Sequence, residues 1–159
     1  RMIVIGYQGI GKSTYSNKDI TCIDLESGNF WVDGVRLDDW YKVYCNIANH
    51  LSKQGYTVFV SSHQVVRDEL KKSDEQVCIV YPSHSLKAEW VQRLYDRYYS
   101  SHLDKDYKAW RNAEERYDEN IDEMISDGKY FSVYEIKSMD YNVNEIVDTL
   151  KKVGDDLDV

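Results

Sequence analysis

The fold is decided by residues 2–13, which read MIVIGYQGIGKS. The run from Met2 to Ile5 is apolar at every position and stops at a glycine. A short continuous apolar run of this kind is typical of a central strand that is buried on both faces of a parallel sheet. A glycine-rich turn follows, and the polar residues after Lys12 are a short helix candidate. The segment therefore predicts a buried strand, a tight turn and a helix.

The turn matches the phosphate-loop pattern, in which a glycine is followed after four residues by Gly-Lys-Ser. Glycines allow successive backbone amides to curl around the phosphates of a nucleotide, and the following helix directs its positive N-terminus at them. The lysine adds a full charge near the β and γ phosphates, and the serine hydroxyl is a ligand for Mg²⁺. We expect the nucleotide to be held by Gly6, Gln8, Gly9, Ile10, Gly11, Lys12, Ser13 and Thr14.

The rest of the chain alternates between strand and helix patterns. Further strands are predicted at 20–24, 56–60, 77–81 and 131–136, and helices at 37–54, 65–70, 86–98, 107–124 and 146–150. One proline and eight glycines leave few breakers, which favours long elements and short connections. The pattern predicts an α/β fold, a three-layer sandwich with a five-stranded, mainly parallel sheet. We expect a single domain from 2 to 153 and a frayed acidic tail from 154 to 159.

Composition and charge narrow the class further. A chain of 159 residues fits one domain, and 42% apolar with 30% charged residues is ordinary for a globular protein. The formal charge of −8 disfavours non-specific attraction to nucleic acid or to an anionic membrane, so an anion must bind in a local basic pocket. No apolar run approaches the roughly 18 residues of a membrane span. We expect a cytoplasmic protein with three buried, reduced cysteines, and its oligomeric state stays open.

Two large classes of phosphate-loop protein fit the sequence poorly. A signalling GTPase needs Asp-x-x-Gly, but no aspartate here is followed three residues later by glycine, and the Asn17-Lys18-Asp19 segment lies too close to the loop to read guanine. A motor or transport ATPase carries an acidic residue at the end of a downstream strand. The third and fourth predicted strands instead end in Ser-Ser-His at 61–63 and Tyr-Pro-Ser at 81–83.

The layout from residue 2 to about 153 resembles the P-loop nucleoside and nucleotide (nucleoside monophosphate) kinase family. The phosphate loop carries the resemblance, together with the order of strands and helices and an arginine-bearing helical segment. One departure is clear, because the aspartate that the family carries after its third strand is absent here. The resemblance implies transfer of a phosphoryl group from ATP, with Mg²⁺, to a small acceptor such as a nucleoside monophosphate. It also implies a short helical lid at about 84–127.

The resemblance also suggests roles for individual residues. Asp24, at the end of the second strand, would orient the acceptor or coordinate Mg²⁺, and Glu26 would face the same side. Lys12 would stabilise the transferring phosphoryl group together with Arg93 and Arg97, which lie four apart on one face of the lid. Glu89 and Asp96 offer both arginines an alternative as surface ion pairs.

Three further residues are candidates for binding the acceptor. The resemblance places Arg67, shortly after the third strand, against the acceptor's phosphate. Phe30 and Trp31 lie in a loop between two glycines, where their rings could stack on a base or pack against the protein.

Two other functions remain open. The chain could be a nucleotide-binding ATPase or switch module that signals through its helical hairpin without phosphorylating a small molecule. It could also be a kinase that acts on a modified base or an end in nucleic acid, although the acidic charge argues against that function.

Overall fold

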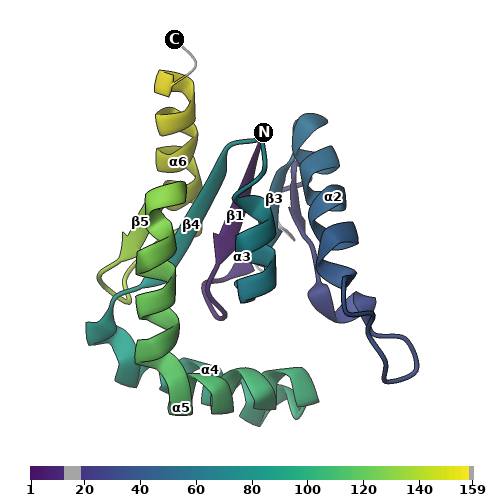
Figure 1. Cartoon of the computed structure of the whole chain (residues 1–159). Coiled ribbons are helices and arrows are strands. Elements are labelled where there is room, and N and C mark those ends of the chain that lie inside the picture. The colour runs from purple at the N-terminus through teal and green to yellow at the C-terminus, as the bar shows by residue number, and fades with distance from the viewer. Residues whose placement is uncertain (13–18, 158–159) are drawn as a thin grey trace.

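The computed structural model describes residues 1–12 and 19–157 and shows a five-stranded sheet flanked by helices (Figure 1). The strands are β1 (Met2–Gly6), β2 (Cys22–Asp24), β3 (Thr57–Val60), β4 (Val77–Pro82) and β5 (Ser132–Ile136). Their order across the sheet is β2-β3-β1-β4-β5, and every neighbouring pair is parallel. The predicted α/β fold with five strands is confirmed. The helix expected directly after Lys12 lies outside the described residues.

Strand β1 lies at the centre of the sheet, as its apolar run predicts. All five of its residues are buried, and Ile3 lies opposite Val58 of β3 on one side and Val77 of β4 on the other. Because chain connections reverse direction around the central strand, a crevice is expected at the carboxyl ends of such strands. The phosphate loop follows β1 at this end of the sheet.

Helices follow most strands. They are α2 (Trp40–Lys53), α3 (Gln64–Leu70), α4 (Lys87–Ser101), α5 (Asp104–Asp127) and α6 (Val143–Leu157), with short 3₁₀ turns η1 (Ser27–Phe30), η2 (His84–Leu86) and η3 (Gly128–Tyr130). Figure 1 shows α4 lying across the end of the sheet at which the strands finish. Helices α4 and α5 form the hairpin that the sequence predicts for the lid.

Helix α5 is bent at Arg116, whose φ of −135° and ψ of 18° are not helical. The bend brings together two side chains from opposite sides of it, since Asn120 Nδ2 donates to Asn112 Oδ1 at 2.7 Å. In a straight helix, residues eight apart are separated by about 12 Å along the axis. The first part of α5 therefore pairs with α4 in the hairpin, while the second part rises beside the sheet (Figure 1).

Several boundaries differ from the predictions. Ile20 is 95% exposed and β2 begins only at Cys22. Helix α2 begins at Trp40 rather than near Leu37, and residues 38–39 form a turn before it. Helix α6 continues to Leu157 with Gly154 buried, so the frayed tail predicted to begin at 154 is wrong in its starting point.

Other expectations hold in the described part of the chain. Cys22, Cys45 and Cys78 are free and buried, and burial raises the pKa of the Cys45 and Cys78 thiols to about 12. Among the described residues, none of the helices is both long and apolar enough to span a bilayer.

Candidate functional site

The phosphate loop leaves β1 with two glycines in the left-handed region of backbone space. Gly9 has φ +89° and Gly11 has φ +103°, conformations that residues with a Cβ adopt only with strain. Gly9 is also tightly packed, since a Cβ built there would lie 3.0 Å from Trp90 Nε1. Gly11 of the sequence pattern, and Gly9 inside it, are thus required by the shape of the turn.

The loop directs its carbonyl groups toward the protein. Trp90 Nε1 donates to Gln8 O at 2.8 Å, Arg93 Nη1 to Gly9 O at 3.1 Å and Tyr141 Oη to Ile10 O at 2.8 Å. Across residues 1–12 and 19–157, by contrast, no acceptor is bonded to the backbone amides of Gln8, Gly9 or Gly11. A turn with occupied carbonyls and free amides is suited to an anionic ligand.

Lys12 lies within this turn, where its Nζ donates to Gly6 O at 3.0 Å. Burial lowers the pKa of its ammonium group, while the nearby carboxylates of Asp24 and Glu26 raise it. The lysine is therefore placed between the phosphate loop and the end of β2. The two remaining loop candidates, Ser13 and Thr14, lie outside the described residues.

Asp24 ends β2 and is half-buried. Burial raises the pKa of its carboxyl group, Lys12 lowers it, and a hydrogen bond with Glu26 raises it again. Glu26 is exposed. The structure thus brings Lys12, Asp24 and Glu26 into one electrostatic cluster at the end of the sheet where the predicted site lies.

Both predicted lid arginines lie against the phosphate loop. Arg93 bonds Gly9 O, and its guanidinium carbon lies 4.6 Å from the centre of the Trp90 ring. Arg97 Nη2 would lie 3.6 Å from a Cβ placed on Gly9, and its Nε is 3.8 Å from Asp106 Oδ1. In the described part of the chain, neither arginine pairs with Glu89 or Asp96, so the alternative of surface ion pairs with those residues is not what the structure shows.

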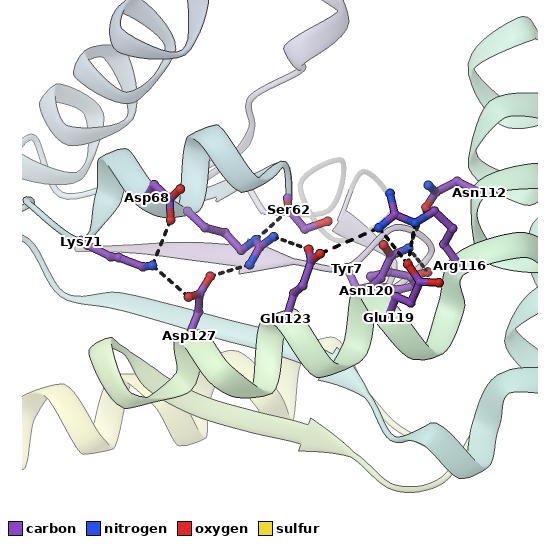
Figure 2. Close-up of polar contacts among 11 residues, drawn as sticks. Tyr7, Ser62, Asp68, Lys71, Asn112, Arg116, Glu119, Asn120, Glu123 and Asp127 are labelled. Carbon is purple, nitrogen blue, oxygen red and sulfur yellow. Dashed lines mark hydrogen bonds and ion pairs between the residues drawn. The ribbon is translucent and has the colours of Figure 1, made fainter.

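Arg67 is placed differently from the prediction. Its side chain is buried between α3 and α5, where Nη1 pairs with Asp127, Nη2 with Glu123 Oε2 at 3.0 Å, and Nε donates to Ser62 O at 3.0 Å. Figure 2 shows this network, in which Asp127 also contacts Lys71. Because all three guanidinium nitrogens already bind protein acceptors, the assignment of Arg67 to the acceptor's phosphate is corrected to a structural contact between the two helices.

The loop after Asp24 contributes aromatic rings and one arginine that sequence reasoning missed. Phe30 packs against Trp40, with ring centres 6.0 Å apart, whereas Trp31 is 51% exposed. The guanidinium of Arg36 lies between two indoles, 3.9 Å from the ring centre of Trp40 and 4.7 Å from that of Trp31. Among the described residues, its side chain makes one hydrogen bond, a long one of 3.4 Å to the carbonyl of Ser27.

No local pattern in the sequence pointed to Arg36, Trp90 or Tyr141. Arg36 stands in an irregular loop, Trp90 fits a core position of its helix, and Tyr141 lies in the connection between β5 and α6. Each becomes part of the site through residues far away in the chain. For metals, the described residues hold no cluster of three or more His, Cys, Asp or Glu side chains suited to an ion.

Comparison with known proteins gives matches in structure but not in sequence. No family model matches the chain, and a search of curated proteins returns no match. Shikimate kinase from Bacteroides thetaiotaomicron is similar in structure, with a TM-score of 0.50 and 11% identity over 100% of this chain and 98% of that one. An uncharacterized protein from Eubacterium ventriosum has a TM-score of 0.52 and 11% identity over 98% of both chains. At this identity the likeness establishes the fold alone, a five-stranded parallel α/β sheet flanked by helices.

Proposed function

We propose that this protein is an ATP-dependent phosphotransferase that acts on a small anionic acceptor, with a nucleoside monophosphate as the expected substrate. The observation that carries the proposal is the loop after β1, where the carbonyls are bonded outward and the amides of Gln8, Gly9 and Gly11 are free among the described residues. The similarity in fold to a shikimate kinase agrees with phosphoryl transfer to a small molecule.

The donor phosphates would bind to the loop amides, with Lys12 neutralising charge on the β and γ groups. Arg93 and Arg97 lie on the lid side of the same loop and would stabilise the charge that develops on the transferring group. These groups position and stabilise the reactants, and phosphoryl transfer of this kind needs no covalent intermediate with the protein.

The carboxylates at the end of β2 fit a hard divalent cation, because Mg²⁺ prefers oxygen ligands and is usually bound through one or two carboxylates and substrate phosphates. Asp24 would hold it, with Ser13 as the second protein ligand that the sequence motif implies. When bound, Mg²⁺ neutralises charge on the donor phosphates. If the acceptor reacts through a hydroxyl, the carboxylate of Asp24 would accept its hydrogen bond.

The acceptor would bind on the β2 side of the site. Arg36 pairs with no carboxylate in the described residues, and its guanidinium lies close to two indole rings, so it is the cation best suited to an acceptor's phosphate. The exposed ring of Trp31 beside it can stack on a base, and Phe30 forms part of the wall behind it. This arrangement takes over the role first assigned to Arg67 and favours a monophosphate over a neutral nucleoside.

A screen of small acceptors with labelled ATP tests the proposal, with Lys12→Ala as the inactive variant and Lys152→Ala, at an exposed position on α6, as the matched control. Transfer to one acceptor should fall on the order of 100-fold in Lys12→Ala and stay unchanged in the control. Slow hydrolysis of ATP with no acceptor would support the alternative of a nucleotide switch. Undiminished transfer by Lys12→Ala would show that the proposed site is wrong.

A further inference from the structure

Three successive peptide groups of the phosphate loop are each held from outside the loop. The carbonyls of Gln8, Gly9 and Ile10 accept hydrogen bonds from Trp90, Arg93 and Tyr141, at 2.8, 3.1 and 2.8 Å. Two of the donors lie on helix α4 and the third lies just before α6. The lid and a distant segment of the chain therefore hold the same turn.

Two of these donors also bond each other. Arg93 Nη1 donates to Tyr141 Oη at 2.6 Å as well as to Gly9 O, and the Tyr141 hydroxyl in turn donates a hydrogen bond to Ile10 O. The tyrosine ring stacks on Trp90 with centres 6.0 Å apart and an angle of 19°. The hydroxyl of Tyr141 is thus both acceptor and donor in a short chain that ends on the loop.

A hydrogen bond that fixes the carbonyl of one residue also fixes the direction of the next residue's backbone amide. In a planar trans peptide the C=O of one residue and the N–H of the next point in opposite directions. The bond from Trp90 to Gln8 O therefore directs the Gly9 amide away from the Trp90 indole, and the bond from Tyr141 to Ile10 O directs the Gly11 amide away from the Tyr141 hydroxyl. Both amides belong to the group that is free of protein acceptors in the described residues.

We propose that Tyr141 is a positioning residue that, with Arg93 and Trp90, fixes the loop amides in the orientation that binds phosphate. This inference rests on the proposed phosphate-binding function and adds to it a role for a residue outside the motif. Preorganised donors cost no rearrangement when the ligand binds, so the effect falls on affinity for the phosphate chain rather than for the nucleoside.

The test compares Tyr141→Phe with the wild-type protein by calorimetric binding of two probes, ATP and inorganic tripolyphosphate. The Tyr141→Phe variant keeps the ring on Trp90 and loses only the hydroxyl. Tyr99→Phe is the matched control, because Tyr99 lies on α4 and is 68% exposed. We expect Tyr141→Phe to lower the affinity for both probes equally, by roughly fivefold to tenfold, as for the loss of one or two hydrogen bonds. The control should bind both probes as the wild type does.

Circular dichroism would show whether each variant still folds. A second variant, Arg93→Lys, tests the chain of hydrogen bonds independently. Arg93→Lys keeps the charge but removes the guanidinium nitrogen Nη1 that donates to both Gly9 O and Tyr141 Oη. Its effect combined with Tyr141→Phe should be smaller than the product of the two single effects. Independent effects would contradict the chain of bonds.

The remaining outcomes separate the two proposals. If Tyr141→Phe binds ATP more weakly but binds tripolyphosphate as before, Tyr141 contacts the nucleoside. If the variant binds both probes as the wild type does, the loop keeps its shape without the Tyr141 hydroxyl. Either result overturns the inference and leaves the proposed function standing. If the wild-type protein binds neither ATP nor tripolyphosphate, both this inference and the proposed function are overturned.

Discussion

Replacing Arg67 with methionine separates its observed role from the role first predicted for it. The Arg67 side chain is 5% exposed and pairs with Asp127 and Glu123 of α5, while its Nε bonds Ser62 O. Methionine has a similar length and fills the space without the charge. The substitution therefore removes the ion pairs and leaves the apolar packing of α3 largely intact.

The expected loss of stability follows from what remains of the network. Breaking a buried ion pair by removing one partner costs about 3–5 kcal/mol, because the other charge is left unpaired. Here Asp127 keeps Lys71, whose Nζ lies 2.9 Å from its Oδ1, and Glu123 is 45% exposed and can be hydrated. The free energy of unfolding should therefore fall by about 2–3 kcal/mol, just below that range. For a chain of this size, the melting temperature should fall by about 5–10 °C.

Urea unfolding and acceptor kinetics form the assay, with Arg36→Met as the matched variant. Arg67→Met should lose stability with an unchanged KM for the acceptor, whereas Arg36→Met should raise that KM and unfold like the wild type, since Arg36 has no ion pair among the described residues. A stable Arg67→Met protein with a KM raised by about tenfold or more would refute the structural assignment and restore the predicted contact with the acceptor.

Other substitutions test the bend, the lid junction and the loop. Asn112→Ala removes the oxygen that accepts hydrogen bonds from both Gln8 and Asn120. Amide hydrogen exchange in residues 104–115 should therefore be about fivefold faster. An unchanged exchange rate would show that the bend in α5 does not depend on these two bonds. The hydrogen bond to Asp118 raises the pKa of His84, so its stabilising effect is present below about pH 6.5 and disappears as the pH rises through that raised pKa. His84→Gln should therefore lower the melting temperature more near pH 6 than near pH 9, and equal losses would rule out this linkage. In Gly9→Ala the alanine must adopt a strained backbone with φ +89°, and its Cβ crowds the Trp90 side chain. The free energy of unfolding, measured with denaturant, should therefore fall by about 1–2 kcal/mol, and ATP should bind more weakly.

The parts of the site that sequence predicts well are those set by local pattern. The phosphate loop could be predicted because glycine spacing and an apolar strand specify it within a dozen residues. The end of β2 was located for a similar reason, and Asp24 and Lys12 do share one electrostatic cluster.

The roles of the arginines could not be predicted in this way, because their partners are distant in the chain. Arg67 meets carboxylates 56 and 60 residues away, and Arg93 meets a hydroxyl 48 residues away. A local charge pattern contains no information about such pairs. Arg36 was missed for the same reason, since only the fold places it between two indoles.

The central position of β1 has a consequence for how the protein is synthesised and folds. Although β1 precedes the other strands in the sequence, it can pair only after Thr57–Val60 and Val77–Pro82 have been made. Closing such long loops is slow, which is the usual cost of parallel sheets. The phosphate loop is bonded in addition to Trp90, Arg93 and Tyr141, so a nascent chain that stops before Tyr141 would contain the whole motif but lack the last of these contacts. Nucleotide binding should therefore emerge late in synthesis, and a ligand present in the cell would favour the completed chain over its shorter precursors.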